Sequence, residues 1–218
     1  MSRSPWKILL FASVASIGAA GWADELPSPD AMWLGQRMVP RALVQGFRDG
    51  IQEDLLNRVL GTRVAAVDQP ALRVRARAAM APLLDQAFPP EVLSGLGAQF
   101  LARHYSADEL RALRVREESP LGQKLRDFDQ MSDQLAAPTP AARDEAREAL
   151  ARRTFDEAER KDLLAFAASP LGRKGQSLAL DLAGFFVEQL ERRWASLQPG
   201  LEPRLRSVAE AVLPPSGK

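Results

Sequence analysis

The sequence predicts an all-α helical bundle, and three observations favour that fold class. Ala, Leu, Arg and Glu are abundant whereas Val, Ile and Tyr are scarce, so good helix formers dominate the composition. Apolar residues recur with helical spacing, and no stretch shows a sustained alternation of β-formers. Pro and Gly stand where these segments begin and end. We therefore expect a bundle of about eight or nine helices.

Three helices are expected in the N-terminal part. Residues 39–59 carry an apolar side chain at every fourth position, with Pro40 in the first turn and Gly61 placed to end the helix. Pro70 begins the next helix, and Pro89-Pro90 interrupts the chain before a third.

The C-terminal part contains a repeated pattern. Residues 106–109 and 156–159 each form a capping box, in which the first side chain and the fourth cap each other's backbone N–H group. Ser-Pro-Leu-Gly-x-Lys follows in both places, at residues 119–124 and 169–174, with five of six positions identical and an offset of fifty. We infer an internal duplication of a helix–turn–helix unit.

This pattern resembles the bacterial exported family called domain of unknown function 2059. In that family, Phe-Thr-x-x-Glu-Leu leads into Ser-Pro-x-Gly-x-Lys, and residues 105–124 and 155–174 both look like it. The first copy has Arg114-Val115-Arg116 where the family usually carries an aromatic residue, which the second copy retains as Phe166. The resemblance implies export and a helical fold, and it supplies no catalytic residues.

The first residues are typical of a secretory signal peptide. Arg3 and Lys7 precede an uncharged apolar run over 8–20, and small residues lead to Ala23, after which cleavage is expected. The run is shorter than the ~20 residues that span a bilayer, so a retained anchor is the less favoured alternative. We expect a periplasmic or secreted chain without a stable membrane span. Its regions are an N-terminal helical one, 24–103, and the duplicated one, 104–218, packed as one domain.

The composition excludes several classes of functional site. The chain has no Cys and one His, which excludes thiol nucleophiles, disulfides and thiolate metal sites. Without the two basic residues of the leader, Lys and Arg balance Asp and Glu to within one charge, so nucleic-acid binding is not expected. We predict no catalytic, cofactor or metal site.

The Ser-Pro-Leu-Gly-x-Lys motifs form the first candidate site. Free N–H groups at a helix start attract anions, the Gly allows close approach, and the Lys adds charge. The alternative, which we prefer, is a helix cap whose Gly permits tight packing of the preceding helix. The residues concerned are Ser119, Pro120, Gly122, Lys124, Ser169, Pro170, Gly172 and Lys174.

A second candidate is the apolar face of residues 178–190. It is interpreted most simply as core, but it is also compatible with a cavity for an acyl chain, and periodicity cannot separate the two. Lys174, Ser177, Asp181 and Glu188 would form the opposite, solvent-facing stripe. The residues that would line such a cavity are Phe166, Leu182, Phe185 and Phe186.

Three polar features are interpreted as ordinary surface. His104 follows a helix end, where a C-capping role is expected. The acidic residues at 127, 129 and 133 lack the calcium-loop pattern. Arg73 and Arg77 lie one turn apart and would contact either an anionic surface or, as we prefer, solvent.

These observations leave three hypotheses for the function. The first is a non-enzymatic binding or interaction protein of the cell envelope, whose partner is an unknown protein or lipid. The second is a carrier of an apolar ligand such as a lipid, held between the helices. The third is an envelope hydrolase built from carboxylates, for which no pair of acids stands out.

Overall fold

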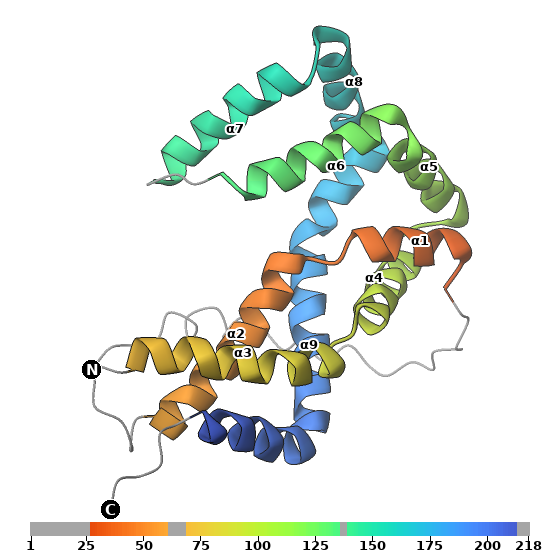
Figure 1. The fold of residues 1–218 in the computed structure, drawn as a ribbon. Helices are drawn as coiled ribbons and strands as arrows, with labels where there is room; N and C mark the ends of the chain where they lie inside the picture. Colours follow the sequence, from red (N-terminus) through yellow and green to blue (C-terminus); the bar gives the residue numbers. More distant parts are fainter. Residues whose placement is uncertain (1–26, 61–68, 136–138, 213–218) are drawn as a thin grey trace, which may run out of the picture.

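The computed structural model describes residues 27–60, 69–135 and 139–212. These residues form nine α-helices and no strand, which confirms the all-α helical bundle (Figure 1). The predicted signal peptide, residues 1–23, lies outside the described residues. The helices are α1 (Pro29–Arg37), α2 (Arg41–Leu60), α3 (Gln69–Ala87), α4 (Pro90–His104), α5 (Ala107–Glu118), α6 (Pro120–Asp133), α7 (Pro140–Thr154), α8 (Glu157–Ala167) and α9 (Pro170–Ala211).

Helix α1 was not predicted. Its nine residues are too few to show a clear apolar period, although Ser28 caps it by accepting from the N–H of Ala31 at 3.2 Å. It packs closely on α4 because both helices present glycine at the crossing. A Cβ on Gly35 would lie 2.5 Å from the backbone nitrogen of Ala98, and one on Gly97 would lie 2.7 Å from the carbonyl oxygen of Gly35.

The larger hydrophobic core joins α2, α3 and the C-terminal part of α9 with the start of α4. The apolar positions predicted for residues 39–59 lie in or against it, and so do Ala76, Met80, Leu83, Leu84 and Ala87 of α3. Burial of its apolar side chains removes apolar area from water, which stabilises the fold. The largest of its fully buried side chains are Leu55, Leu56, Met80, Leu84, Phe88, Leu190 and Leu205.

Helix α9 connects this core with a second one. It starts beside α8 and runs along the molecule until it bends next to α2 and α3 (Figure 1). Pro199 and Pro203 lie inside the helix near the bend, where each removes a backbone hydrogen bond. Leu201 and Leu205 thereby reach the larger core. The predicted boundary after residue 103 therefore does not separate two cores, since α9 contributes to both.

The second core lies between α1, α4 and α5. Its buried residues include Leu34, Leu101 and Leu110, and Leu171 and Leu178 from the start of α9 pack against it. Because α1 and α4 belong to the N-terminal region while α5 and α9 belong to the duplicated one, this core joins the two predicted regions.

The duplicated unit has three helices rather than two. Helices α4 and α7 begin at Pro90 and Pro140, and the third helices, α6 and α9, begin at Pro120 and Pro170, in both cases at the same offset of fifty residues. The third helix of each copy packs on the first helix of the other, since α6 contacts α7 and α9 contacts α4. The two copies are thus interlocked instead of lying side by side.

Candidate functional site

The predicted helix caps are present in both copies. Ser119 Oγ accepts from the N–H of Gly122 at 3.0 Å, and Ser169 Oγ accepts from the N–H of Gly172 at 3.1 Å, with Pro at the first helical position each time. Both capping boxes are also complete, with Glu109 in the first copy and Glu159 in the second. One of the free N–H groups of each motif is therefore satisfied by the chain itself.

The motif glycines lie where the preceding helix ends. A Cβ on Gly122 would be 2.3 Å from the carbonyl oxygen of Arg116, and one on Gly172 would be 2.1 Å from that of Phe166. Only glycine fits at such distances. The contacts agree with the packing alternative that we preferred for the motif.

The motif lysines cross between the copies. Lys124 Nζ lies 2.6 Å from the Glu159 carboxylate, and Lys174 Nζ lies 2.7 Å from that of Glu109, so each lysine pairs with the capping-box glutamate of the other copy. Lys174 was predicted on a solvent-facing stripe. This is wrong, because Lys174 is half-buried where the two copies meet. An anion site would need the positive charges of these two lysines, but the two glutamates already neutralise them.

Each lysine also lies over an aromatic ring of the other copy. Lys174 Nζ is 4.9 Å from the centre of the Tyr105 ring, and Lys124 Nζ is 5.7 Å from that of Phe155. Tyr105 and Phe155 are equivalent residues, at the ends of α4 and α7. The same type of contact is therefore made twice between equivalent residues.

These contacts change the pKa values of the groups involved. Hydrogen bonding to Lys174, and then to the Ser106 N–H, lowers the pKa of Glu109. Lys124, and then the Asp156 N–H, lowers the pKa of Glu159 in the same way. Both carboxylates are accordingly held in the ionised form.

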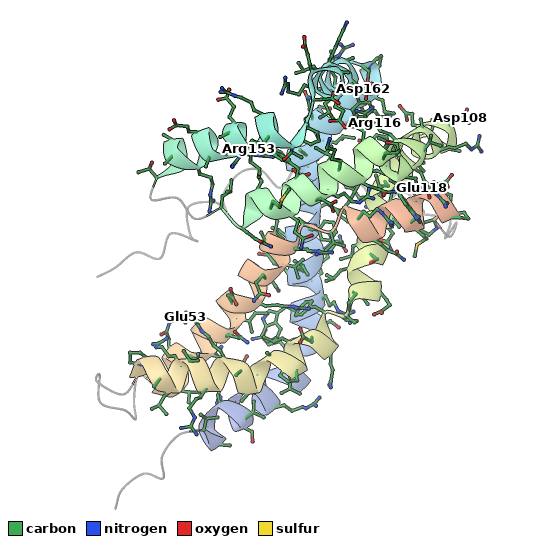
Figure 2. All side chains as sticks on the ribbon, turned by 45° about the horizontal axis from the view of Figure 1, so that its top comes forward. Glu53, Asp108, Arg116, Glu118, Arg153 and Asp162 are labelled. Atoms are coloured by element: carbon green, nitrogen blue, oxygen red, sulfur yellow. The ribbon has the colours of Figure 1, made fainter. Side chains whose placement is uncertain are left out.

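Two other equivalent residues meet between α5 and α8. The Arg116 guanidinium lies 4.0 Å from the centre of the Phe166 ring, and its Nη1 donates to Asp162 at 3.2 Å (Figure 2). Arg116 and Phe166 occupy the same position of the two copies. The arginine in the first copy thus stacks on the aromatic residue that the second copy retains.

A cavity of about 270 Å³ opens where the two copies meet, and it is called the junction cavity below. Its walls come from both copies and from the end of α1, and most of the lining side chains are apolar. The lining residues are Leu34, Arg37, Met38, Tyr105, Leu113, Glu117, Arg126, Asp129, Phe166, Leu171, Gly172 and Gly175.

The charged residues of the cavity differ in their partners. Arg126 Nη1 donates to the Glu117 carboxylate at 2.9 Å, and Asp129 lies 3.5 Å from Arg147. Arg37 stacks on the Trp33 ring at 3.5 Å and donates to the Trp33 carbonyl, with no carboxylate partner among the described residues. It is the cation of this cavity that remains available for an acidic group.

The structure separates the four residues proposed to line an apolar cavity. Phe166 lines the junction cavity, whereas Phe186 is fully buried. Phe185 packs against Phe186 and against Phe100, with ring centres 6.1 and 5.6 Å apart. Leu182 is half-buried on the same helix. The core interpretation fits Phe186, while Phe185 is half-buried beside it, and the four do not surround one common space.

The polar features expected at the surface are distributed as follows. His104 ends α4, with its ring 4.3 Å from that of Phe100. Arg73 and Arg77 of α3 do not simply face solvent, because both pair with Glu53 of α2, which Figure 2 labels beside α3. Among the described residues, no group of three or more His, Asp or Glu is placed to hold a metal ion.

The crossed lysine–glutamate pairs were missed from the sequence. Their members are 35 and 65 residues apart, so no local rule connects them. Only the symmetry of the spacing pointed to them, since each copy offers one capping-box glutamate and one motif lysine.

Comparison with known proteins adds no relative: no family model, no curated protein and no solved structure matches the chain. Within the described part of the chain, no helix has the length and apolarity needed to cross a membrane.

Proposed function

We propose that this protein is a non-enzymatic binding protein of the cell envelope, whose junction cavity receives an apolar side chain of a partner protein. The observation that carries the proposal is the cavity itself, which is lined by apolar and charged side chains from both copies of the duplicated unit together with α1. The envelope location rests on the leader-like residues 1–23 and on the resemblance of the repeated motif.

The size of the cavity favours a side chain as its occupant. At about 270 Å³ it falls below the range of about 300–1,000 Å³ that is usual for small-molecule pockets. A single large anchor residue in such a pocket is typical of the centre of a protein–protein interface. The long acyl chain of a lipid occupies a larger volume than this cavity provides. The volume therefore supports the interaction hypothesis over the carrier hypothesis.

The charges indicate what should flank that anchor. Arg37 lines the cavity with its guanidinium on the Trp33 ring and without a carboxylate partner among the described residues. An acidic residue next to the apolar anchor of the partner would pair with it. Charge complementarity of this kind favours the correct partner and increases the association rate.

The carboxylates near the cavity favour binding over hydrolysis. A glycosidase-type general acid needs a raised pKa so that it carries a proton near neutral pH. Glu109 and Glu159 have lowered pKa values, and Glu117 is paired with Arg126. These acids are placed to hold the two copies together.

The test uses two glycines of α9 as a matched pair. A Cβ on Gly175 would touch only the Tyr105 hydroxyl, at 3.6 Å, so Gly175→Leu places a side chain at the cavity. Gly184 is exposed and has nothing within 4 Å, so Gly184→Leu brings the same gain in helix propensity away from the cavity. Peptides are selected from a displayed random library on the purified protein, and their affinities are measured by titration calorimetry.

The selected peptides should share an apolar anchor beside an acidic residue. Gly175→Leu should weaken their binding about tenfold or more, and Gly184→Leu less than about twofold. In a double-mutant cycle, Arg37→Glu and replacement of the peptide's acidic residue by Ala should change the binding free energy by amounts that do not add. Equal effects of the two leucine variants would contradict the proposal. So would a bound lipid-sized mass in native mass spectrometry that Gly175→Leu removes, which would establish the carrier function.

A further inference from the structure

A second cavity lies beside the segment that links α1 to α2. It has a volume of about 350 Å³, within the usual range of small-molecule pockets. No lining residue is shared with the junction cavity. The lining residues are Gln36, Val39, Arg41, Val44, Gln45, Arg48, Pro90, Leu93 and Ser94.

The charged side chains that line this cavity are all basic. Its charged lining residues are Arg41 and Arg48, and no carboxylate is among the described residues that line it. Arg41 has no carboxylate partner in the described part of the chain. Arg48 donates to the Phe88 carbonyl at 2.6 Å and pairs with the mostly exposed Asp85, while its Nε is buried without a hydrogen-bond partner among the described residues. The cavity therefore presents more positive charge than its surroundings neutralise.

The backbone adds to this positive potential. Helices α2 and α4 both begin at the cavity, with Arg41 and Pro90 as their first residues, and the N-terminus of a helix carries a partial positive charge. Helix α2 has no acidic residue in its first turn, whereas α4 carries Glu91 there, and Pro89 at the N-cap of α4 provides no side-chain cap. An anion here would be stabilised by two guanidinium groups and by the start of α2, where no carboxylate of the first turn already offsets the helix dipole.

The remaining walls define the rest of the ligand. Val39, Val44 and Leu93 form an apolar surface, and Val44 and Leu93 are buried members of the larger core. An inorganic ion would leave this surface unused. A molecule with both an anionic group and an apolar part would contact the arginines and the apolar wall at the same time.

We propose that this cavity binds a small organic anion, whose carboxylate or phosphate group is held by Arg41 and Arg48 and whose apolar part lies against Val39, Val44 and Leu93. The inference is independent of the junction cavity. Either site can fail its test without affecting the other.

Arg41 offers a variant that separates binding from folding. Arg41→Glu reverses the charge at the cavity, and it also places an acid in the first turn of α2, where the helix dipole favours it. We therefore expect an unchanged or slightly raised Tm together with a loss of anion binding. Arg75→Glu, at an exposed position of α3, changes the net charge equally and is the matched control.

The probe is phenyl phosphate, titrated into the purified full chain by calorimetry. Inorganic phosphate and benzyl alcohol test its two halves. Phenyl phosphate should bind about tenfold more tightly than either. Arg41→Glu should weaken its binding by about tenfold or more, while Arg75→Glu should change it less than about twofold.

Three results would overturn the inference. The first is the absence of saturable binding up to about 10 mM phenyl phosphate. The second is an equal loss in Arg41→Glu and Arg75→Glu, which would mean that only net charge matters. The third is equal affinity for phenyl phosphate and for either of its halves, which would remove the argument for a ligand with both parts.

Discussion

The two copies of the three-helix unit share the caps of their second and third helices and their glycine contacts, but they differ in what covers them. In the first copy, α1 lies across α4 and α5, and Leu110 is only 3% exposed. The equivalent residue of the second copy is Arg160, which donates to the Phe155 carbonyl at 2.9 Å instead of entering a core. The unit therefore forms with or without a covering helix, and its outer face is adapted to its neighbour.

The same difference appears along the first helix of each copy. Gly97 and Ala98 of α4 are buried against α1, while the equivalent Arg147 and Glu148 of α7 are exposed. Small residues allow two backbones to approach closely, whereas long charged side chains keep a face in water. A helix placed on α7 in the manner of α1 would have to bury these charges, which is unfavourable.

The largest expected effect concerns what the copies share. Gly122→Ala and Gly172→Ala should each lower the free energy of unfolding by about 3 kcal/mol or more, because the new Cβ would overlap a backbone carbonyl. Chemical denaturation of both variants measures this. Gly184→Ala is the control, and it should raise stability by up to about 1 kcal/mol. Tolerance of alanine in one copy only would show that the copies do not share this contact.

A slightly smaller effect tests where the copies differ. Gly97→Ala should cost about 2–3 kcal/mol, since its Cβ would lie 2.7 Å from the Gly35 carbonyl oxygen. Arg147→Ala, at the equivalent position, should change stability by less than about 0.5 kcal/mol, because its pair with Asp129 is exposed. Thermal unfolding of the two variants gives the comparison. Similar losses at both positions would mean that α7 is covered too.

The next comparison is between Leu110 and Arg160. Leu110→Ala should cost about 2 kcal/mol through lost burial and the space left behind. Arg160→Ala removes one hydrogen bond to a backbone carbonyl and should cost about 0.5–1 kcal/mol. Denaturant midpoints resolve a difference of this size. A larger loss for Arg160→Ala would reverse the assignment of covered and uncovered copies.

The smallest effect is the pH dependence of the crossed pairs. Lowered carboxylate pKa values stabilise the folded state above the ordinary value near 4.5, and this stabilisation is lost as the pH falls through the folded-state values. Lys124→Met and Lys174→Met should therefore each flatten the loss of stability below about pH 4.5. Unfolding curves between pH 3 and 7 measure the slope. An unchanged slope in both variants would show that the pairs do not form in solution.

Much of the fold is determined by the sequence alone, because its signals act within a few residues. The Ser-Pro helix starts, both capping boxes and the apolar faces of α2 and α3 depend on hydrogen bonds and periodicity that span three to four positions. The offset of fifty residues likewise revealed the duplication, although only its middle part was visible.

The first helices of the two copies, α4 and α7, escaped detection as equivalent elements. Helix α4 is apolar and glycine-rich where α1 covers it, whereas α7 is rich in charged residues and faces solvent. Their common starting point at Pro90 and Pro140 was the remaining signal.

The tertiary structure alone decided the site. The crossing of Lys124 to Glu159 and of Lys174 to Glu109 joins residues that no local rule relates, and it makes the motif lysines structural. Both cavities form where the end of α1 and its link to α2 meet other helices, which are α2 and α4 at one cavity and α5, α6, α8 and the start of α9 at the other. Local patterns specify which faces are apolar, but which faces meet depends on contacts between residues distant in the chain. Those contacts exist only once the helices have packed.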